Sequence, residues 1–341
     1  MKQALIFSLL LLLVTTCYSQ VIKGTTLDAE TKEHIPFAAV YFNGTLAGTT
    51  SDEDGAFELD ITRFATKPLT IRAMGYETRV LESIQADESL KIYLTPKLFE
   101  IEEVKVQTKN LTKKRNSYLK LFTREFLGTS RYQKKCKILN EEDITFNYGS
   151  DNRIVKAFTR NPLRIYNGAL GYEITYFLDK FEYDKNNGSL SFEGDIVFNN
   201  DLAIQQSADE SFISRRKHAY LGSCMHFFRA LWENNLEMSG FRVVRISSKM
   251  STFGNPSNEE SEVMVKYEDI VFEQDLNSKY LLAFEGQLTI YYESMDESRV
   301  SFLKPAVLFG KNGFFDPSGI RWFGYMAELR VADMLPYEYM P

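Results

Sequence analysis

Short apolar runs separated by glycine and Asp-Gly turns dominate residues 21–94 of this 341-residue chain. Two such runs are 21–24 and 36–40, and a third begins after the turn pair Asp54 and Gly55. Glycine tolerates the positive φ of tight hairpin turns, and short strands at intervals of roughly ten residues are typical of a two-sheet sandwich. We therefore expect residues 20–95 to fold as a small β-sandwich.

The order of these runs matches a recurrent pattern. A glycine follows the first run, residues 36–40 read Pro-Phe-Ala-Ala-Val, residues 48–57 read Gly-Thr-Thr-Ser-Asp-Glu-Asp-Gly-Ala-Phe, and Gly75 precedes Tyr76. This pattern is similar to the carboxypeptidase-regulatory-like domain, a transthyretin-like β-sandwich frequent in exported proteins of Bacteroidota. The resemblance implies a non-catalytic module for adhesion, folding support or partner docking. It implies no peptidase activity.

The first residues predict export. Lys2 precedes an apolar run, 4–14, that is shorter than the ~20 residues a membrane-spanning helix needs. We expect a signal peptide over residues 1–19, with cleavage after Ser19. A lipoprotein leader with Cys17 as the lipidated residue is less favoured, because Thr16 stands where a small residue usually precedes that cysteine. The mature chain is expected to be secreted, in the periplasm or associated with the outer membrane.

The length of the chain makes two domains the default expectation, since single domains usually hold roughly 100 to 200 residues. We expect a linker over 96–112 and a β-rich α+β domain over 113–341 with two or three helices, so that the whole chain is mainly β. Residues 137–200 alternate like a strand meander, and apolar spacing predicts helices near 111–126, 211–235 and 322–335. The first helix is basic, and we favour packing on the domain over binding to an anionic membrane.

The second domain also contains a recognisable order of short motifs. They are Cys-x-Ile-x-Asn at 136–140, Pro-Leu-x-Ile-x-Asn at 162–167, Leu-Gly-Tyr at 170–172 and Gly-Ser-x-x-His-Phe at 222–227. This order resembles the second half of uncharacterised Bacteroidota envelope proteins that begin with the same sandwich. The resemblance implies no activity, cofactor or catalytic residue.

Residues that could carry chemistry are few. Of three histidines, His218 and His226 belong to the helix 211–235 without a third ligand, and His226 is expected to point away from the apolar stripe, toward solvent or a second surface. Cys224 fits the apolar stripe of that helix, so we expect Cys136 and Cys224 to be separate buried thiols rather than a disulfide or a nucleophile. The acidic run 141–143 is interpreted as a solvated charge cluster. We predict no metal, no cofactor and, because the net charge is −6 without a basic patch, no nucleic-acid partner.

Aromatic residues are the remaining unusual feature, with 26 Phe and 19 Tyr. Core packing explains most of them. Those near the turn-rich C-terminal region could instead line a groove for a sugar, lipid or peptide, and we take four as candidate binding residues: Tyr291, Tyr292, Trp322 and Tyr325.

These features together predict an exported, non-catalytic binding or scaffold protein of the cell envelope, whose sandwich docks a partner. The partner would be an envelope protein or a glycan or peptide ligand. One alternative is an accessory subunit of an outer-membrane β-barrel transporter, because residues 102–106, Glu-Glu-Val-Lys-Val, resemble a segment that often precedes a transporter plug. The other is a hydrolase with its site in the second domain.

Overall fold

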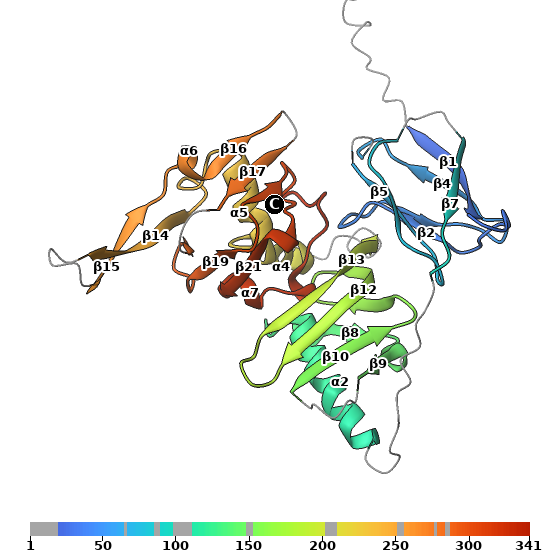
Figure 1. Cartoon of the computed structure of the whole chain (residues 1–341), viewed down its shortest axis with the longest axis horizontal. Helices are drawn as coiled ribbons and strands as arrows, with labels where there is room; N and C mark the ends of the chain where they lie inside the picture. Colours follow the sequence, from blue (N-terminus) through green and yellow to red (C-terminus); the bar gives the residue numbers. More distant parts are fainter. Residues whose placement is uncertain are drawn as a thin grey trace, which may run out of the picture. The chain divides into compact units, whose positions relative to one another are not determined.

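The computed structural model describes residues 20–64, 67–84, 89–97, 111–147, 153–201, 210–250, 256–275, 278–283 and 287–341. The chain divides into two compact units, Met1–Glu103 and Val104–Pro341 (Figure 1). Its architecture is mainly β, as predicted. The expected leader 1–19, the segment 102–106 and most of the expected linker lie outside the described residues. None of the described helices is long and apolar enough to span a bilayer.

The first unit is a two-sheet sandwich, which confirms the fold expected for this part of the chain. One sheet has the order β4-β1-β7, in which β1 runs antiparallel to β4 and parallel to β7. The other has the order β3-β2-β5-β6. Alternate side chains of both sheets, such as Ile22, Leu59 and Ile71, are buried between them. The strands are β1 (Val21–Asp28), β2 (Ala39–Tyr41), β3 (Gly48–Thr50), β4 (Ala56–Asp60), β5 (Leu69–Arg72), β6 (Arg79–Leu81) and β7 (Ser89–Leu94).

The predicted Asp-Gly turn leads into β4. The Oδ1 atom of Asp52 accepts hydrogen bonds from the backbone N–H groups of Asp54, at 3.0 Å, and Ala56, at 2.8 Å. Gly55 has φ +69°, and a Cβ atom there would lie 2.7 Å from the carbonyl oxygen of Thr26. Both the turn and its close approach to β1 therefore require glycine.

The first part of the second unit is a six-stranded sheet covered on one face by a helix. The order is β8-β11-β12-β10-β9, and β13 pairs with the other edge of β12. Phe122 and Phe126 of helix α2 are fully buried and contact Phe181 and Tyr176 of β12, so this helix packs on its own unit as expected (Figure 1). The elements are α2 (Leu111–Leu127), β8 (Cys136–Ile138), β9 (Ile144–Phe146), β10 (Ile154–Thr159), β11 (Leu163–Asn167), β12 (Tyr172–Asp184) and β13 (Leu190–Asp201).

Two helices and two further sheets complete the unit. The larger sheet has the order β15-β14-β18-β19-β21 and the smaller one β16-β17-β20. The helices and strands are α4 (Glu210–Tyr220), α5 (Cys224–Trp232), β14 (Phe241–Met250), β15 (Pro256–Met264), α6 (Tyr267–Ile270), β16 (Val271–Glu273), β17 (Lys279–Leu282), β18 (Leu288–Tyr292), β19 (Ser298–Phe302), β20 (Ala306–Phe309), β21 (Ile320–Gly324) and α7 (Tyr325–Glu328). In the described residues only α2, α4 and α5 exceed a single turn, in line with the two or three helices expected.

Two helix predictions need correction. The expected helix 211–235 is two helices, because Gly222 has φ +75° and Ser223 caps α5 by accepting a hydrogen bond from the N–H of His226 at 3.2 Å. The expected closing helix 322–335 is wrong. Residues 320–324 form strand β21, which pairs with β19, and Gly324 ends it at φ +72°, outside the helical range. A single turn, α7, follows.

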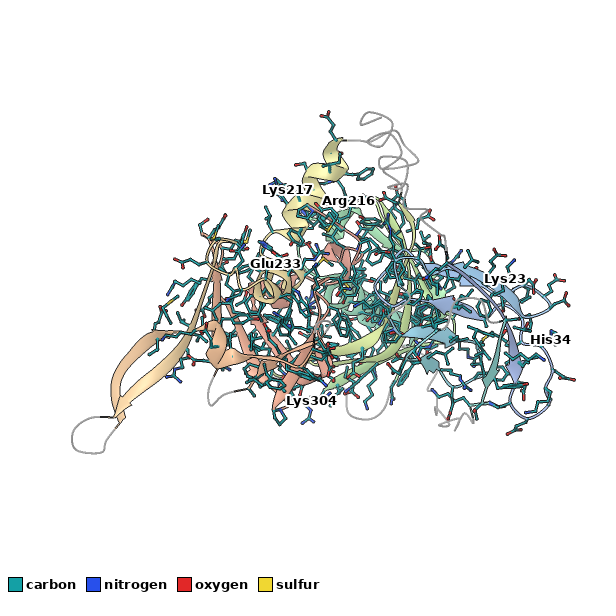
Figure 2. All side chains as sticks on the ribbon, turned by 90° about the horizontal axis from the view of Figure 1, so that it is seen from above. Lys23, His34, Arg216, Lys217, Glu233 and Lys304 are labelled. Atoms are coloured by element: carbon teal, nitrogen blue, oxygen red, sulfur yellow. The ribbon has the colours of Figure 1, made fainter. Side chains whose placement is uncertain are left out.

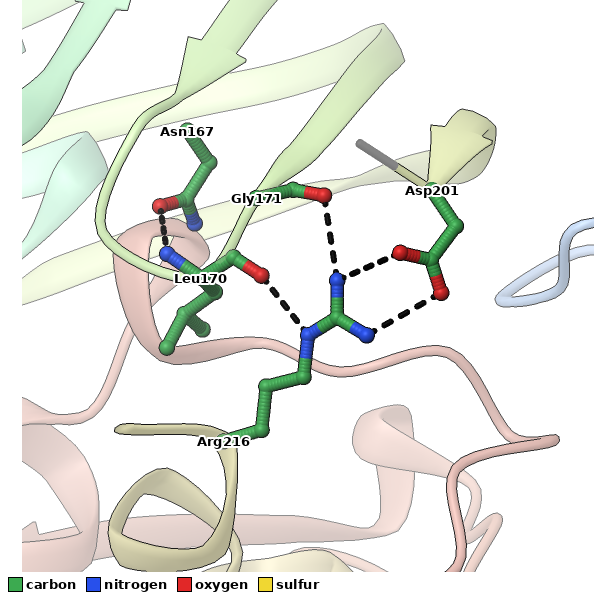
Figure 3. A network of polar contacts seen from close by, with 5 residues as sticks. All are labelled: Asn167, Leu170, Gly171, Asp201 and Arg216. Atoms are coloured by element: carbon green, nitrogen blue, oxygen red, sulfur yellow. Dashed lines mark hydrogen bonds and ion pairs between the residues drawn. The ribbon is translucent and has the colours of Figure 1, made fainter. Parts of the chain in front are cut away.

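A buried arginine connects α4 to the six-stranded sheet. Arg216 is only 7% exposed, and its guanidinium makes a bidentate ion pair with Asp201, with N–O distances of 2.7 and 3.0 Å (Figure 3). It also donates to the carbonyl oxygens of Leu170, at 2.7 Å, and Gly171, at 3.1 Å. The guanidinium lies 4.0 Å from the ring centre of Tyr172. One side chain thus fixes α4, the end of β13 and the turn between β11 and β12.

Asn167 organises the same turn from within. Its Oδ1 atom accepts from the N–H groups of Ala169, at 3.1 Å, and Leu170, at 3.0 Å (Figure 3). Its Nδ2 atom donates to the carbonyl oxygen of Ala332 at 3.0 Å. The turn that receives Arg216 is therefore also tied to the C-terminal segment.

Replacing Arg216 should strongly destabilise the second unit. Arg216→Ala leaves the Asp201 carboxylate and two carbonyl groups without their partner, and we expect a loss of about 3–5 kcal/mol in the free energy of unfolding. Trp232 and Trp322, the two tryptophans of the chain, both lie in this unit, so tryptophan fluorescence during urea unfolding measures it selectively. Lys217→Ala, at the exposed neighbouring position, should change the value by less than about 0.5 kcal/mol (Figure 2). Equal effects of the two substitutions would refute this role for Arg216.

Candidate functional site

The four predicted aromatic binding residues do not converge on one surface. Tyr291 and Tyr292 are neighbours on β18, so their side chains point to opposite faces of the sheet. Tyr292 is 5% exposed and packs against His226 and Phe241. Tyr291 donates a hydrogen bond from its hydroxyl to Glu262 at 2.9 Å. The structure thus places one of this pair in the core and the other in a surface polar contact.

Trp322 and Tyr325 lie on the same segment but in different surroundings. The Trp322 ring packs against Phe228 and Phe315, and its indole N–H is buried with no hydrogen-bond partner among the described residues. Tyr325 is half-buried at the start of α7, and burial raises the pKa of its hydroxyl. That these four residues bind a ligand stays a prediction. The packing of Tyr292 and Trp322 gives those two residues a structural role.

The histidine and cysteine of α5 are also packed groups. Cys224 and Cys136 are separate free thiols, and burial raises the pKa of each to about 12. His226 is 9% exposed and packs against Tyr292 and Phe241, so of the two expected surroundings, solvent and a second surface, the structure shows the second surface. Its Nδ1 atom accepts from the N–H of Gly222 at 3.2 Å, and burial lowers its pKa to about 4. These surroundings suit a neutral structural imidazole. Across the described ranges, no three His, Cys, Asp or Glu residues are grouped so that they could hold a metal ion.

One end of the sandwich exposes two large apolar side chains. Phe37 is 65% exposed and Met74 is 75% exposed. The antiparallel register of β2 and β5 pairs Ala39 with Arg72, so Phe37 and Met74 leave the sheet at the same end. Phe37 has φ +58°, a conformation that is a genuine outlier for a bulky residue. The fold therefore holds an aromatic ring in solvent on a strained backbone.

Polar contacts keep this end of the sandwich in place. The N–H of Phe37 donates to the carbonyl of Ser51 at 3.2 Å, and the N–H of Ala38 donates to the Ser51 hydroxyl at 2.8 Å. The Tyr76 hydroxyl donates to the Asp28 carboxylate at 2.9 Å, which anchors the turn that carries Met74. Hydrogen bonds from the N–H groups of Thr31 and Glu30 lower the pKa of Asp28. The surrounding loops are acidic, with exposed carboxylates at Glu33, Asp52, Glu53 and Asp54.

The second unit has a polar cavity of about 390 Å³ on the face of the six-stranded sheet opposite α2. Asn140, which is 4% exposed, forms its rigid wall. The Nδ2 atom of Asn140 donates to Asp143, at 2.8 Å, and to the carbonyl of Pro162, at 3.0 Å, while its Oδ1 atom accepts from the N–H of Arg164 at 2.8 Å. Asn161 donates to the same Asp143 oxygen at 3.3 Å. The polar groups of this wall therefore hydrogen-bond one another and the backbone.

Three other side chains complete the cavity, and two of them have no protein partner. The Glu142 carboxylate and the Arg164 guanidinium are exposed and make no hydrogen bond or ion pair within the described part of the chain. The Thr175 hydroxyl accepts from the Nδ2 atom of Asn199 at 2.7 Å. Arg115 of α2 donates to the carbonyl of Glu141 at 2.8 Å and so fixes the backbone next to Glu142. An anion-binding fork and a carboxylate therefore share one concave site.

The sequence analysis missed this cavity because strand pairing builds it. Leu139, at the end of β8, donates its N–H to the carbonyl of Arg164 at 2.7 Å, which brings segments 25 residues apart together. Read alone, the run 141–143 looked like a solvated charge cluster. The one local signal was a pair of asparagines, Asn140 and Asn161, each two residues beyond the end of a strand.

Comparison with known proteins identifies the first unit. Residues 22–106 match the family model described as CarboxypepD_reg-like domain. The sandwich is a CarboxypepD_reg-like domain. The exposed pair Phe37 and Met74 therefore lies on this domain, and the polar cavity lies outside the matched residues.

The other comparisons add little. A search of curated proteins gives no match. Among solved structures, a crystal structure of a 9R-lipoxygenase from Cyanothece PCC8801 aligns at 11% identity and a TM-score of 0.17. The alignment covers 65% of this chain and 48% of the lipoxygenase, so the chain spans about half the length of that protein. A likeness this low carries no argument about fold or activity.

Replacing His226 should weaken the acid sensitivity of the second unit. The folded pKa, about 4, lies below the ordinary value of 6.5, so the fold favours the neutral ring. That contribution is complete above pH 6.5 and is lost as the pH falls toward 4, by up to about 3 kcal/mol. We expect the unfolding free energy of His226→Gln to fall less between pH 7 and pH 4.5 than that of the wild type. The exposed His218→Gln should keep the wild-type slope, and the same slope in His226→Gln would contradict the assignment.

Asp333 should affect the pH dependence of the unfolding free energy in the opposite direction to His226. Its side chain is 6% exposed, its Oδ2 atom has no hydrogen-bond partner in the described residues, and burial raises its pKa from 3.8 to about 6. Stability is then lost as the pH rises through 6, so the stability of Asp333→Asn relative to wild type should increase by about 2–3 kcal/mol from pH 4 to pH 7. Asp296→Asn, at an exposed turn, serves as the control. A constant difference for Asp333→Asn would refute the prediction.

The effects of His226 and Asp333 oppose each other between pH 4 and pH 6. The pH profile of the wild type alone can therefore be nearly flat even if both assignments are correct. Each variant must be compared with wild type at the same pH.

Proposed function

We propose that this chain is an exported, non-catalytic binding or scaffold protein of the cell envelope. Its CarboxypepD_reg-like domain docks a partner protein, and its second unit presents a ligand-binding surface. The observation that carries the proposal is the exposed Phe37 side chain, held in a strained backbone conformation beside the exposed Met74. Strain that surrounding contacts maintain is typical of recognition sites.

The energetics of this end favour association. Burying a Phe or Met side chain that water now surrounds contributes roughly 1.5–3 kcal/mol. The backbone around Phe37 is already fixed by Ser51, so little of that energy is lost in ordering the loop. The acidic loops around the pair favour a partner with an apolar recess and a basic rim, whose association should weaken at high salt. The partner we propose is an envelope protein of that chemistry.

The transporter-accessory reading is a special case of this proposal, in which the partner is an outer-membrane β-barrel. The hydrolase reading has one supporting observation, namely that the Glu142 and Asp143 carboxylates line the same cavity. Asp143 already accepts hydrogen bonds from both Asn140 and Asn161, which leaves it less available for catalysis. The binding function is the better supported of the two.

The experiment is affinity capture from solubilised cell envelope with the tagged full chain and the double variant Phe37→Asn with Met74→Ser. Asparagine tolerates positive φ, so the double variant should fold at least as well as wild type. We expect one envelope protein to be recovered by wild type and by a Val80→Ser control, at least about tenfold less by the double variant, and less at high salt.

Recovery that is equal with the double variant would refute docking through Phe37 and Met74. Recovery of no partner by the wild-type chain would refute the scaffold function itself. Identification of the recovered protein as a membrane β-barrel would select the transporter-accessory version.

A further inference from the structure

We propose that the polar cavity of the second unit binds an acidic saccharide, with Arg164 holding the carboxylate of a uronic-acid residue. This inference rests on the proposed function in one respect, namely that the second unit presents a ligand-binding surface. It adds the chemical class of the ligand and the residues that recognise it.

Arg164 is the first reason for an acidic ligand. Its guanidinium offers five N–H donors in a planar fork, and none has an acceptor within the described ranges. Its backbone is fixed on both sides, because its N–H donates to Asn140 and its carbonyl accepts from the N–H of Leu139. A carboxylate matches this fork in a bidentate geometry that a neutral ligand lacks. The arginine is therefore positioned on a rigid strand with its donors unused.

The rest of the cavity suits hydroxyl groups. Besides Pro162 and Arg164, its lining residues carry two amides, two carboxylates and one hydroxyl, which are groups that can hydrogen-bond the hydroxyls of a sugar. The Glu142 carboxylate can accept hydrogen bonds from two hydroxyls, and the Asn161 carbonyl oxygen can accept another. An oligosaccharide whose residues carry both a carboxylate and several hydroxyls can satisfy Arg164 and these acceptors together.

Tyr166 extends the site beyond the cavity. It lies two residues after Arg164 on β11, so both side chains point to the same face of the sheet, roughly 7 Å apart. The ring is 37% exposed, and its combination of apolar face and polar edge suits the C–H face of a pyranose. One sugar residue in the cavity and the next over Tyr166 would use both features. The ligand is thus expected to be an oligosaccharide rather than a single sugar.

An acidic peptide fits this site less well. Peptides commonly bind by adding a strand to a free sheet edge. Arg164 and Tyr166 lie on β11, which is paired with β8 on one side and β12 on the other, so its backbone groups are already used. A peptide would have to bind through side chains alone.

The test is isothermal titration of the full chain with trigalacturonate, with neutral galactotriose and tri-glutamate as comparison ligands. We expect trigalacturonate to bind, and each comparison ligand to bind at least about tenfold more weakly. Arg164→Gln should reduce affinity at least about tenfold, and Tyr166→Ser and Glu142→Gln by smaller factors. Arg160→Gln serves as the matched control, because Arg160 is exposed in the connection between β10 and β11 and does not line the cavity.

Several outcomes would overturn the proposal. These are no heat of binding at about 1 mM trigalacturonate, equal binding of tri-glutamate, or unchanged affinity in Arg164→Gln. Thermal unfolding of each variant checks that a lost affinity is not lost structure. The result is independent of docking by the sandwich, because the Phe37→Asn with Met74→Ser variant should bind trigalacturonate as wild type does.

Discussion

A buried guanidinium sets the geometry of the second unit. Arg216 is tolerated in the interior because Asp201 balances its charge and the carbonyls of Leu170 and Gly171 accept from two more of its N–H groups. Those acceptors belong to the turn between β11 and β12 and to the end of β13. The interaction is therefore possible in one register of these strands. A shift of one residue would leave a buried charge unpaired and would turn every side chain of β11 to the opposite face.

The register fixed at that turn determines what the open face of the sheet presents. Pairing of β11 with β12 places Arg164 opposite Thr175, and pairing with β8 places it beside Leu139. Buried residues of the same strand, Leu163 and Ile165, occupy the face that packs toward the core. Successive side chains of a strand point to opposite faces of the sheet. The apolar residues of β11 therefore stabilise the core on one face, while its polar residues are available for binding on the other.

The sequence predicts the sandwich well because its signals are local. Turn residues such as Gly55 and the alternation of β4 can be read within ten positions. The errors arise where distant segments decide the structure. The predicted closing helix is wrong because β21 pairs with β19, and the surroundings of His226 stayed open because the spacing of α5 does not reveal that Tyr292 and Phe241 cover its second side. The cavity was missed for the same reason, since Asn140 and Arg164 meet only through pairing of β8 and β11.

The two candidate binding surfaces share one structural feature. In each, a nearly buried polar residue hydrogen-bonds the backbone at or beside the residue that carries the recognition group. The Ser51 carbonyl accepts from the N–H of Phe37 and the Ser51 hydroxyl from the N–H of Ala38, and the Asn140 side chain accepts from the N–H of Arg164. The backbone is thereby ordered before any ligand arrives, while the phenyl ring and the guanidinium have no protein partner in the described residues. Because conformational entropy lost on binding opposes affinity, exposed groups on fixed backbones can bind usefully through few contacts. Both surfaces therefore combine an ordered backbone with an exposed side chain, as recognition sites do.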